Sequence, residues 1–364
     1  MSDNEEFEAE EEVGEEMGDE EAAPEAGDGQ EEEGDEEKPE EAEGEEEQQA
    51  EEEEEEEKPP DAPLTEEIVG ECLSLLCKTG DGLAHAYVKL DVHDRELTDI
   101  SILNSFIHVR YVDISKNNLK DIAPLNSLTH LLTLKADYNL LKSAKLDELP
   151  YLQVASFNNN RIKTTEGVNH PSLEQLSLNF NEITSVSGLE PGLLNRLHTL
   201  ELRGNRLQTT DGIYLPNLKN LFLGANTIKR IEGLERLEHL TTLHLRDNQL
   251  ESLDGFSEGM KNLQYVNIRG NDLKDVKEVK KLQCLPLLRA LVLSDNPMAE
   301  AEEGDYRLEV LIALRRIERL DKDEYTEEER QEAEEIYKQR LEEELANEGQ
   351  EEVVGSDNEE IQME

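Results

Sequence analysis

The chain has 364 residues and a formal net charge of −53, from 89 Asp and Glu against 36 Lys and Arg. This excess disfavours a nucleic-acid binder and a protein of anionic membrane surfaces, because both need clustered Lys and Arg. Residues 1–60 hold 33 of the acids and residues 322–364 hold 18, so the middle region is nearly balanced and long enough to bury a sizeable core.

Neither secretion nor membrane insertion is expected. The first residues lack the positive and apolar regions of a signal peptide, and no apolar run reaches the roughly 18 residues that a membrane span needs. The three cysteines, Cys72, Cys77 and Cys284, suit neither a disulfide framework nor a zinc site. We therefore expect a reducing, cytoplasmic location.

Residues 1–63 form an acidic arm that we expect to be disordered. Glu, Ala, Gly, Gln and Pro dominate it, and residues 51–57 are all Glu. Like-charge repulsion and the shortage of apolar surface leave nothing to offset the entropy of the chain. Folded structure should begin at residue 64.

Residues 64–87 predict a helix that caps the N-terminal end of the fold. Thr65 is an N-cap candidate followed by two Glu residues, which the helix dipole favours. Gly80 is a stop signal. The apolar residues at helical spacing between them are Ile68, Val69, Cys72, Leu73 and Leu76. Such a helix would cover the open edge of the array that follows.

Residues 88–300 contain about ten repeats of 21–25 residues. Each combines an alternating apolar stretch with an Asn three residues after its last apolar position, and a degenerate first unit has Arg95 in that place. The alternation predicts a strand that pairs in parallel with the next, and an inward Asn that bonds the backbone. The expected fold is α/β, a right-handed leucine-rich repeat solenoid with a parallel sheet on its concave face. The nine matching positions are Asn117, Asn139, Asn160, Asn181, Asn205, Asn226, Asn248, Asn271 and Asn296.

After the last Asn, residues 301–325 predict a C-terminal cap made of a helix and a strand. Residues 326–349 then predict a charged amphipathic helix, which opens with a Thr326–Glu329 capping box. Residues 350–364 are a further acidic tail, expected to be disordered.

The predicted helix 326–349 carries a narrow apolar stripe. Two interpretations stay open: the helix is solvated or packs back on the cap, or it is a docking helix whose stripe only a partner buries. The stripe residues are Ala333, Ile336, Tyr337, Leu341 and Leu345.

The motif search predicts no catalytic residue, no cofactor and no metal site. The sequence has no phosphate-binding glycine loop, no nucleophile elbow, no zinc-protease motif and no Cys or His cluster at metal spacing. We therefore expect that the protein is not an enzyme.

The candidate binding surface is the concave face, which we define as the strand positions two, four and six residues before each Asn. Arg and aromatic residues gather in its C-terminal half, and both are enriched at protein interfaces. The alternative is that exposed strands simply need polar residues for solubility, which is the favoured interpretation for the N-terminal half. The candidate partner-binding residues are Arg203, Phe222, His244, Arg246, Tyr265 and Arg269.

The repeat type and cap resemble the 22-residue class of intracellular leucine-rich repeat proteins, which includes phosphatase-1 regulators and axonemal dynein light chains. Within that class, four stretches look like the radial-spoke leucine-rich repeat proteins of motile cilia and sperm flagella. The likeness covers about residues 64–335, and the first stretch is its specific part. The stretches are LSLLCKTGDGLAHAYVKL (Leu73–Leu90), HVRYVDIS (His108–Ser115), LHTLELRGN (Leu197–Asn205) and LTTLHLRDNQ (Leu240–Gln249).

This resemblance implies a non-enzymatic adaptor of the axonemal radial spoke, needed for spoke assembly and for ciliary and flagellar motility. Its partners would be radial-spoke subunits in a large axonemal complex, and its location the cytoskeleton of motile cilia and sperm flagella. Two alternatives stay open. One is a phosphatase-1-type regulatory subunit, and the other is an acidic nuclear leucine-rich repeat chaperone that binds basic proteins through its arm.

Overall fold

The computed structural model describes residues 60–364 apart from residues 81, 83, 301–305 and 360–364. The predicted disorder of the acidic arm, residues 1–63, therefore concerns residues that lie almost entirely outside the described part. The same holds for the end of the predicted acidic tail.

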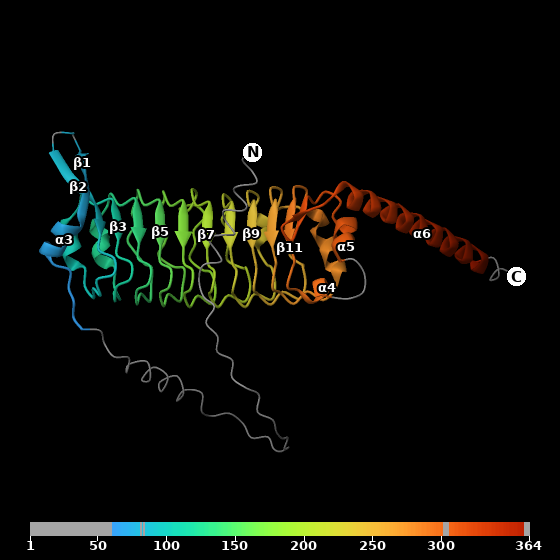
Figure 1. The fold of residues 1–364 in the computed structure, drawn as a ribbon, viewed down its shortest axis with the longest axis horizontal. Helices are drawn as coiled ribbons and strands as arrows, with labels where there is room; N and C mark the ends of the chain where they lie inside the picture. Colours follow the sequence, from blue (N-terminus) through green and yellow to red (C-terminus); the bar gives the residue numbers. More distant parts are fainter. Residues whose placement is uncertain (1–59, 81, 83, 301–305, 360–364) are drawn as a thin grey trace, which may run out of the picture. The chain divides into compact units, whose positions relative to one another are not determined.

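Thirteen strands within the described residues form one sheet, in which every strand pairs with the next along the chain (Figure 1). Pairing is parallel from β2 (Ala84–Asp91) to β12 (Arg319–Leu320) and antiparallel only at the two ends. This regular parallel order confirms the α/β leucine-rich repeat solenoid. The repeat strands are β3 (Tyr111–Asp113), β4 (Thr133–Lys135), β5 (Val154–Ser156), β6 (Gln175–Ser177), β7 (Thr199–Glu201), β8 (Asn220–Phe222), β9 (Thr242–His244), β10 (Tyr265–Asn267) and β11 (Ala290–Val292).

The repeated Asn residues form a buried ladder, as the sequence predicts. The Asn139 side chain shows the pattern: its Oδ1 accepts a hydrogen bond from the Leu119 backbone N at 3.1 Å. Its Nδ2 donates to the carbonyls of Ile114 at 3.1 Å and Ala136 at 3.2 Å. Each Asn thus satisfies backbone groups of two neighbouring repeats, which is why a buried polar residue is tolerated here.

Short 3₁₀ helices on the return side close the core, because repeats of 21–25 residues leave little chain for a longer helix. Each places at least one apolar side chain in the interior, such as Leu103, Leu125 and Leu234, all fully buried. Leucines of the strands and of the return segments together form one continuous core. The 3₁₀ helices are η1 (Ser101–Ser105), η2 (Ala123–Ser127), η3 (Leu234–Arg236) and η4 (Val276–Cys284).

The N-terminal end differs from its prediction. The helix α3 spans only Glu66–Cys72, and Leu73–Thr79 is a strand, β1, antiparallel to β2 (Ala84–Asp91). Thr65 is the N-cap as predicted, since its side chain accepts a hydrogen bond from the backbone N of the third residue after it, at 3.4 Å. The prediction of a helix continuing toward Gly80 was wrong because pairing with the open edge of β2 outweighs the helical spacing of the apolar residues.

The C-terminal end contains the predicted helix and strand. They are α5 (Tyr306–Ala313) and β12 (Arg319–Leu320), preceded by α4 (Pro297–Glu300) and followed by β13 (Asp323–Glu324) and α6 (Glu327–Glu359). No helix within the described part of the chain is long and apolar enough to span a bilayer.

Helix α6 begins at the predicted capping box. The Thr326 backbone N donates to the Glu329 carboxylate at 2.7 Å, and the Glu329 backbone N donates to the Thr326 hydroxyl at 3.2 Å. The helix continues to Glu359, so the expectation of a disordered tail from residue 350 was wrong for most of that segment. Isolated glycines without a proline or cap weaken a helix but do not end it.

Candidate partner-binding surfaces

The concave face has a polar part between β4 and β7. The Asp137 carboxylate accepts hydrogen bonds from the Ser156 hydroxyl at 2.6 Å and from the Asn158 backbone N at 2.7 Å. The Asn158 Oδ1 accepts from the Asn179 backbone N at 2.8 Å, and the Asn179 amide donates to Glu201 at 2.6 Å. These side chains bond chiefly to one another. Their arrangement fits the interpretation that this part supports solubility and repeat order.

Burial changes the ionisation of one acid in this polar part. Desolvation raises the pKa of the Asp137 carboxyl, although hydrogen bonds from Ser156 and Asn158 act in the opposite direction. A half-buried acid that needs both donors is better suited to holding adjacent strands in register than to binding a partner.

The concave face has an aromatic part between β8 and β10. The rings of Phe222 and His244 have centroids 4.8 Å apart, and those of His244 and Tyr265 are 5.1 Å apart. The Arg203 guanidinium lies 4.4 Å from the centroid of the Phe222 ring. The structure therefore brings four of the six predicted concave residues into one row, which we call the aromatic row. Phe222 and Tyr265 are each only 5% exposed, so their rings are buried between neighbouring side chains.

His244 is the centre of the aromatic row and is only 5% exposed. Its Nε2 atom has no hydrogen-bond partner among the residues that the structure describes. Burial lowers the pKa of His244 to about 3, and the charges of Arg203 and Arg246 act in the same direction. The imidazole is therefore neutral near pH 7.

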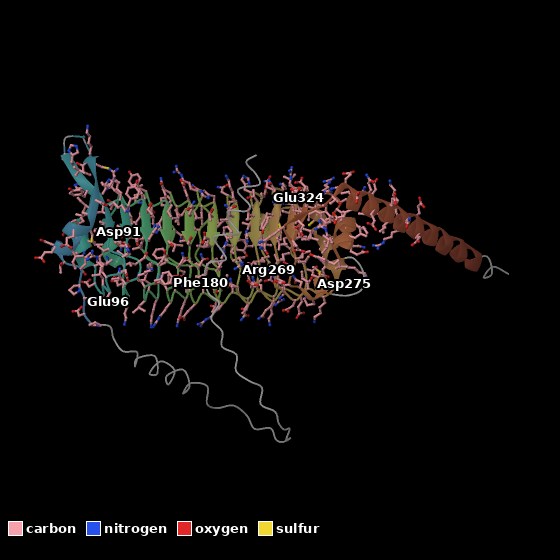
Figure 2. The ribbon with its side chains drawn as sticks, in the orientation of Figure 1. Asp91, Glu96, Phe180, Arg269, Asp275 and Glu324 are labelled. Carbon is pink, nitrogen blue, oxygen red and sulfur yellow. The ribbon has the colours of Figure 1, made fainter. Side chains whose placement is uncertain are left out.

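The other two predicted arginines border the aromatic row. The Nε of Arg246 lies 3.5 Å from the Asp247 carboxylate, and the Nε of Arg269, labelled in Figure 2, lies 2.6 Å from the Asp295 carboxylate. Each acid comes from the position just before a ladder Asn. These pairs give the border of the row a mixed charge, which favours a partner that offers polar groups of both signs.

Helix α6 covers part of its own stripe. Ala333 is buried, and Ile336 and Tyr337 are partly buried against the core. Leu341 is 42% exposed, and the side chain of Leu345 lies outside the described residues. The root of the helix thus packs on the cap, which buries Ala333 and partly buries Ile336 and Tyr337.

Two ion pairs hold the root of α6 on the cap. The Nε of Arg307 lies 2.6 Å from a Glu329 oxygen, and Arg340 donates to both carboxylate oxygens of Glu309, at 2.5 and 2.9 Å. The hydrogen bond from Arg307 lowers the pKa of Glu329 to about 2. The cap and the helix root therefore form one unit, which we call the C-terminal clamp.

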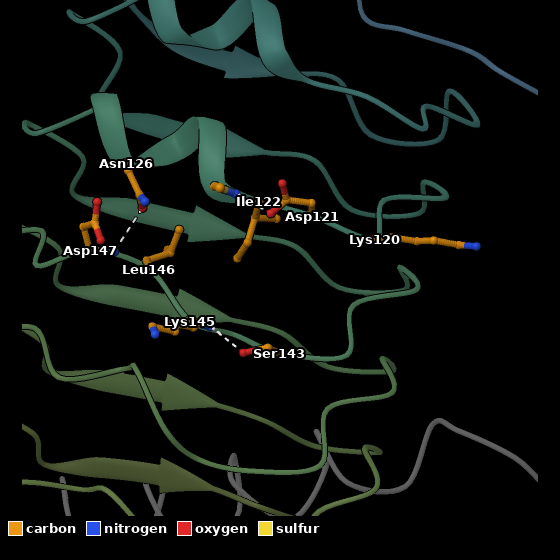
Figure 3. Close-up of a pocket in the computed structure, with 9 residues that line it drawn as sticks. Lys120, Asp121, Ile122, Asn126, Ser143, Lys145, Leu146 and Asp147 are labelled. Atoms are coloured by element: carbon orange, nitrogen blue, oxygen red, sulfur yellow. Dashed lines mark hydrogen bonds between the residues drawn. The ribbon is translucent and has the colours of Figure 1, made fainter. Parts of the chain in front are cut away.

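A cavity of about 350 Å³ lies away from both surfaces, between two return segments (Figure 3). Two of its polar side chains are already paired: Asn126 accepts from the Asp147 backbone N of the next repeat at 3.0 Å, and Ser143 accepts from the Lys145 backbone N at 3.1 Å. No group of three or more potential metal ligands occurs among the described residues. This region carries no argument for a ligand.

The predictions from the sequence did not include the hairpin of β1 and β2 as a surface. Leu75, Leu76 and Tyr87 are 50–57% exposed there. A signal was present: two apolar runs flank the Gly80–Gly82 segment, and that is a hairpin pattern. The helical spacing of the first run concealed it.

Comparison with known proteins agrees with the fold. A family model described as leucine-rich repeat matches residues 194–349. Leucine-rich repeat-containing protein 23 of Xenopus tropicalis is 59% identical over 292 residues, covering 80% of this chain and 83% of that protein. The bovine protein of the same name is 56% identical over 274 residues, covering 75% of this chain and 80% of the relative.

A solved leucine-rich repeat protein of Leptospira interrogans superposes with a TM-score of 0.52 at 23% identity, covering 64% of this chain and 60% of that one. At this identity the likeness concerns the fold alone. Leucine-rich repeat proteins of this fold typically serve as scaffolds without catalytic activity.

Proposed function

The chain belongs to the leucine-rich repeat-containing protein 23 family, and from this premise we propose that it is a non-enzymatic scaffold of the axonemal radial spoke. In this role it would be needed for spoke assembly and for motility of cilia and sperm flagella. Its location would be the axoneme, and its partners would be other spoke subunits.

The resemblance of Leu73–Leu90 and the repeat stretches to radial-spoke leucine-rich repeat proteins carries this proposal. The geometry supports an adaptor because it offers a surface for binding a partner, while the motif search predicts no catalytic residue. The rings of Phe222, His244 and Tyr265 are each only 5% exposed, so they support the arginines beside them, and arginine is enriched at interfaces. The rigid strands of the aromatic row hold these groups in fixed positions, which limits the entropy lost on binding.

The structure also narrows the part of the predicted docking helix that a second partner could contact. Because the C-terminal clamp covers the root of α6, the part available to a partner begins near Leu341. Two attachment points on one rigid scaffold, the aromatic row and the distal part of α6, would raise the effective concentration of each subunit near the other.

A phosphatase-1-type regulator is the second candidate. It would also use the concave face, but it would co-purify with a phosphatase catalytic subunit from cells without cilia. An acidic nuclear chaperone is the third candidate, and it would bind histones through residues 1–60 and accumulate in nuclei. Both alternatives predict a location outside the axoneme.

The test expresses the tagged full chain in multiciliated cells that lack the endogenous protein, and then determines its location and the motility of the cilia. We expect the tagged protein in the axoneme and restored motility. Nuclear or diffuse signal would overturn the radial-spoke proposal and favour an alternative.

A charge-reversed variant, Arg203→Glu with Arg269→Glu, should fail to join the axoneme if the aromatic row binds a subunit. Arg206→Glu is the matched control, because the Arg206 side chain is 66% exposed and pairs only loosely with Glu182, at 3.9 Å. Ending the chain after Glu343 tests the distal helix while keeping both ion pairs of the C-terminal clamp. Unchanged incorporation of all these variants would show that neither surface is used.

A further inference from the structure

The hairpin of β1 and β2 has one face that is entirely exposed to solvent. Residues directly opposite each other in an antiparallel pair point to the same side, and Leu76 lies opposite Tyr87. In Figure 1 the hairpin projects past the row of repeat strands at the N-terminal end of the sheet. All side chains on this face are exposed, and they are Ser74, Leu76, Lys78, His85, Tyr87 and Lys89.

The centre of this face is apolar. Leu76 is 57% exposed and Tyr87 is 50% exposed, and the neighbouring Leu75 is 52% exposed with a φ of +58°. A left-handed backbone costs a β-branched or bulky residue free energy, and leucine gains nothing from solvent exposure. Exposed apolar pairs on a projecting element are typical of binding sites.

The rim of this face is basic. Its ionisable side chains are Lys78, His85 and Lys89, and no carboxylate lies among the six residues of the face. Lys89 makes a loose ion pair, with its Nζ 3.9 Å from the Asp91 carboxylate. In a chain with a net charge of −53, a basic rim around an apolar centre is a local exception.

We propose that this hairpin face binds a segment of another protein that carries an apolar side chain flanked by Asp or Glu. The apolar side chain would pack on Leu76 and Tyr87, and the carboxylates would pair with Lys78 and Lys89. Charge complementarity selects this partner chemistry and disfavours a second copy of the chain, because two chains of −53 repel each other. The inference does not depend on the radial-spoke assignment.

The position of the face adds a reason for its use. Lys89 lies opposite Tyr111 in the sheet, at a concave position of β3. The hairpin face therefore continues the concave face at its N-terminal end, far along the strand order from the aromatic row. A partner on the hairpin would leave the aromatic row accessible.

The first experiment measures binding of a fluorescein-labelled peptide, a Leu-Phe pair flanked by four Glu on each side, to the full chain by fluorescence anisotropy. Leu76→Ser with Tyr87→Ser should weaken binding at least about tenfold, because both anchors are lost. Lys78→Glu with Lys89→Glu should weaken it similarly and flatten its salt dependence. Tyr151→Ser is the matched control, since Tyr151 is 53% exposed elsewhere on the molecule, and it should bind like the unaltered chain.

Two control peptides define specificity: Ser-Ser in place of Leu-Phe, and Lys in place of Glu. Both should bind at least about tenfold more weakly than the original. Circular dichroism of each variant checks that the fold is intact. Equal affinity of either double variant and the unaltered chain, or equal binding of the Lys peptide, would overturn the proposal.

The second experiment identifies the natural occupant. A photo-reactive benzoylphenylalanine in place of Tyr87 is cross-linked in an extract of the cells that normally express the chain, and the product is sequenced. The proposal expects a segment of another protein with an apolar residue between acidic ones. Cross-links to residues 1–57 of the same chain or to a second copy, or to a segment without acidic flanks, would contradict it.

Discussion

The two ends of the sheet are closed in opposite ways. At the N-terminal end, a two-stranded hairpin extends the sheet and leaves Leu76 and Tyr87 in solvent. At the C-terminal end, α5 and the root of α6 cover the last strands, and the C-terminal clamp fixes them with ion pairs. The C-terminal end is covered, as expected where the core only needs protection from solvent. The N-terminal end leaves apolar side chains exposed and is therefore suited to bind another protein.

The Asn ladder shows the same asymmetry. At its start, the Asn117 Oδ1 accepts hydrogen bonds from the backbone N of Arg95 and Leu97 in the first unit. The Arg95 side chain, which stands in the Asn position, makes no ladder bond and is exposed. Past its finish there is no further repeat, and the Asp321 carboxylate of the cap takes the place of the next strand's backbone carbonyl: it accepts from the backbone N of Leu293 and Ser294, at 2.7 and 2.8 Å. The C-terminal end therefore depends on one side chain in a way that the N-terminal end does not.

The largest expected effect comes from Asp321→Ala. The substitution leaves two backbone N–H groups and the Tyr306 hydroxyl without their acceptor, so we expect a loss of about 3 kcal/mol. Hydrogen exchange should then accelerate in β11 and β12 first, because repeat proteins lose structure unit by unit.

Arg95→Ala is the matched change at the other end. It should alter stability by less than about 0.5 kcal/mol, because the side chain is exposed and the ladder does not use it. Similar losses for Arg95→Ala and Asp321→Ala in urea unfolding would remove the asymmetry of the ladder.

A smaller loss, about 1–2 kcal/mol, is expected from Arg307→Met. Arg307 bonds the Glu329 carboxylate and the Glu324 carbonyl, both at 2.6 Å, and lies 4.1 Å from the centroid of the Tyr325 ring. Methionine keeps much of the packing but none of the charge. The readout is faster hydrogen exchange in the first turns of α6, and unchanged exchange there would show that the clamp does not hold the helix.

The clamp should also respond to acid. Because Arg307 lowers the pKa of Glu329 to about 2 from its usual 4.5, the pair contributes stability that is complete above pH 4.5 and lost as pH falls toward 2. NMR titration of the Glu329 carboxyl should give a midpoint near 2 and return toward 4.5 in Arg307→Met. A midpoint near 4.5 in the unaltered protein would contradict the clamp.

The sequence predicted the repeating features more completely than the features that occur once. The nine Asn positions and the buried leucines recur with a fixed period, so one template fits all of them. Each end is built from a single segment, and there the local pattern was ambiguous. Leu73 and Leu76 fit a helix by spacing, but the open edge of β2 made them a strand.

The binding surfaces were predictable only in part. Strand alternation placed Phe222, His244 and Tyr265 on one face, and the structure stacks them. The stripe of α6 was equally clear in the sequence, but only tertiary contacts decide that the cap covers Ala333. One backbone feature was also not visible in the sequence. The residue before each ladder Asn has a left-handed backbone conformation, as at Lys116 with a φ of +55°, although few of these residues are glycine.

The smallest expected effect is the most informative for the N-terminal end. Leu76→Ser with Tyr87→Ser should change stability by less than about 0.5 kcal/mol, since both side chains are already in solvent. Val88→Ser, one residue along the same strand but 1% exposed, should cost about 2–3 kcal/mol because it places a hydroxyl in the core. Near-neutral stability together with lost peptide binding would mean that Leu76 and Tyr87 serve recognition. A double-variant loss as large as that of Val88→Ser would make the hairpin face part of the fold, and the contrast between the two ends would fail.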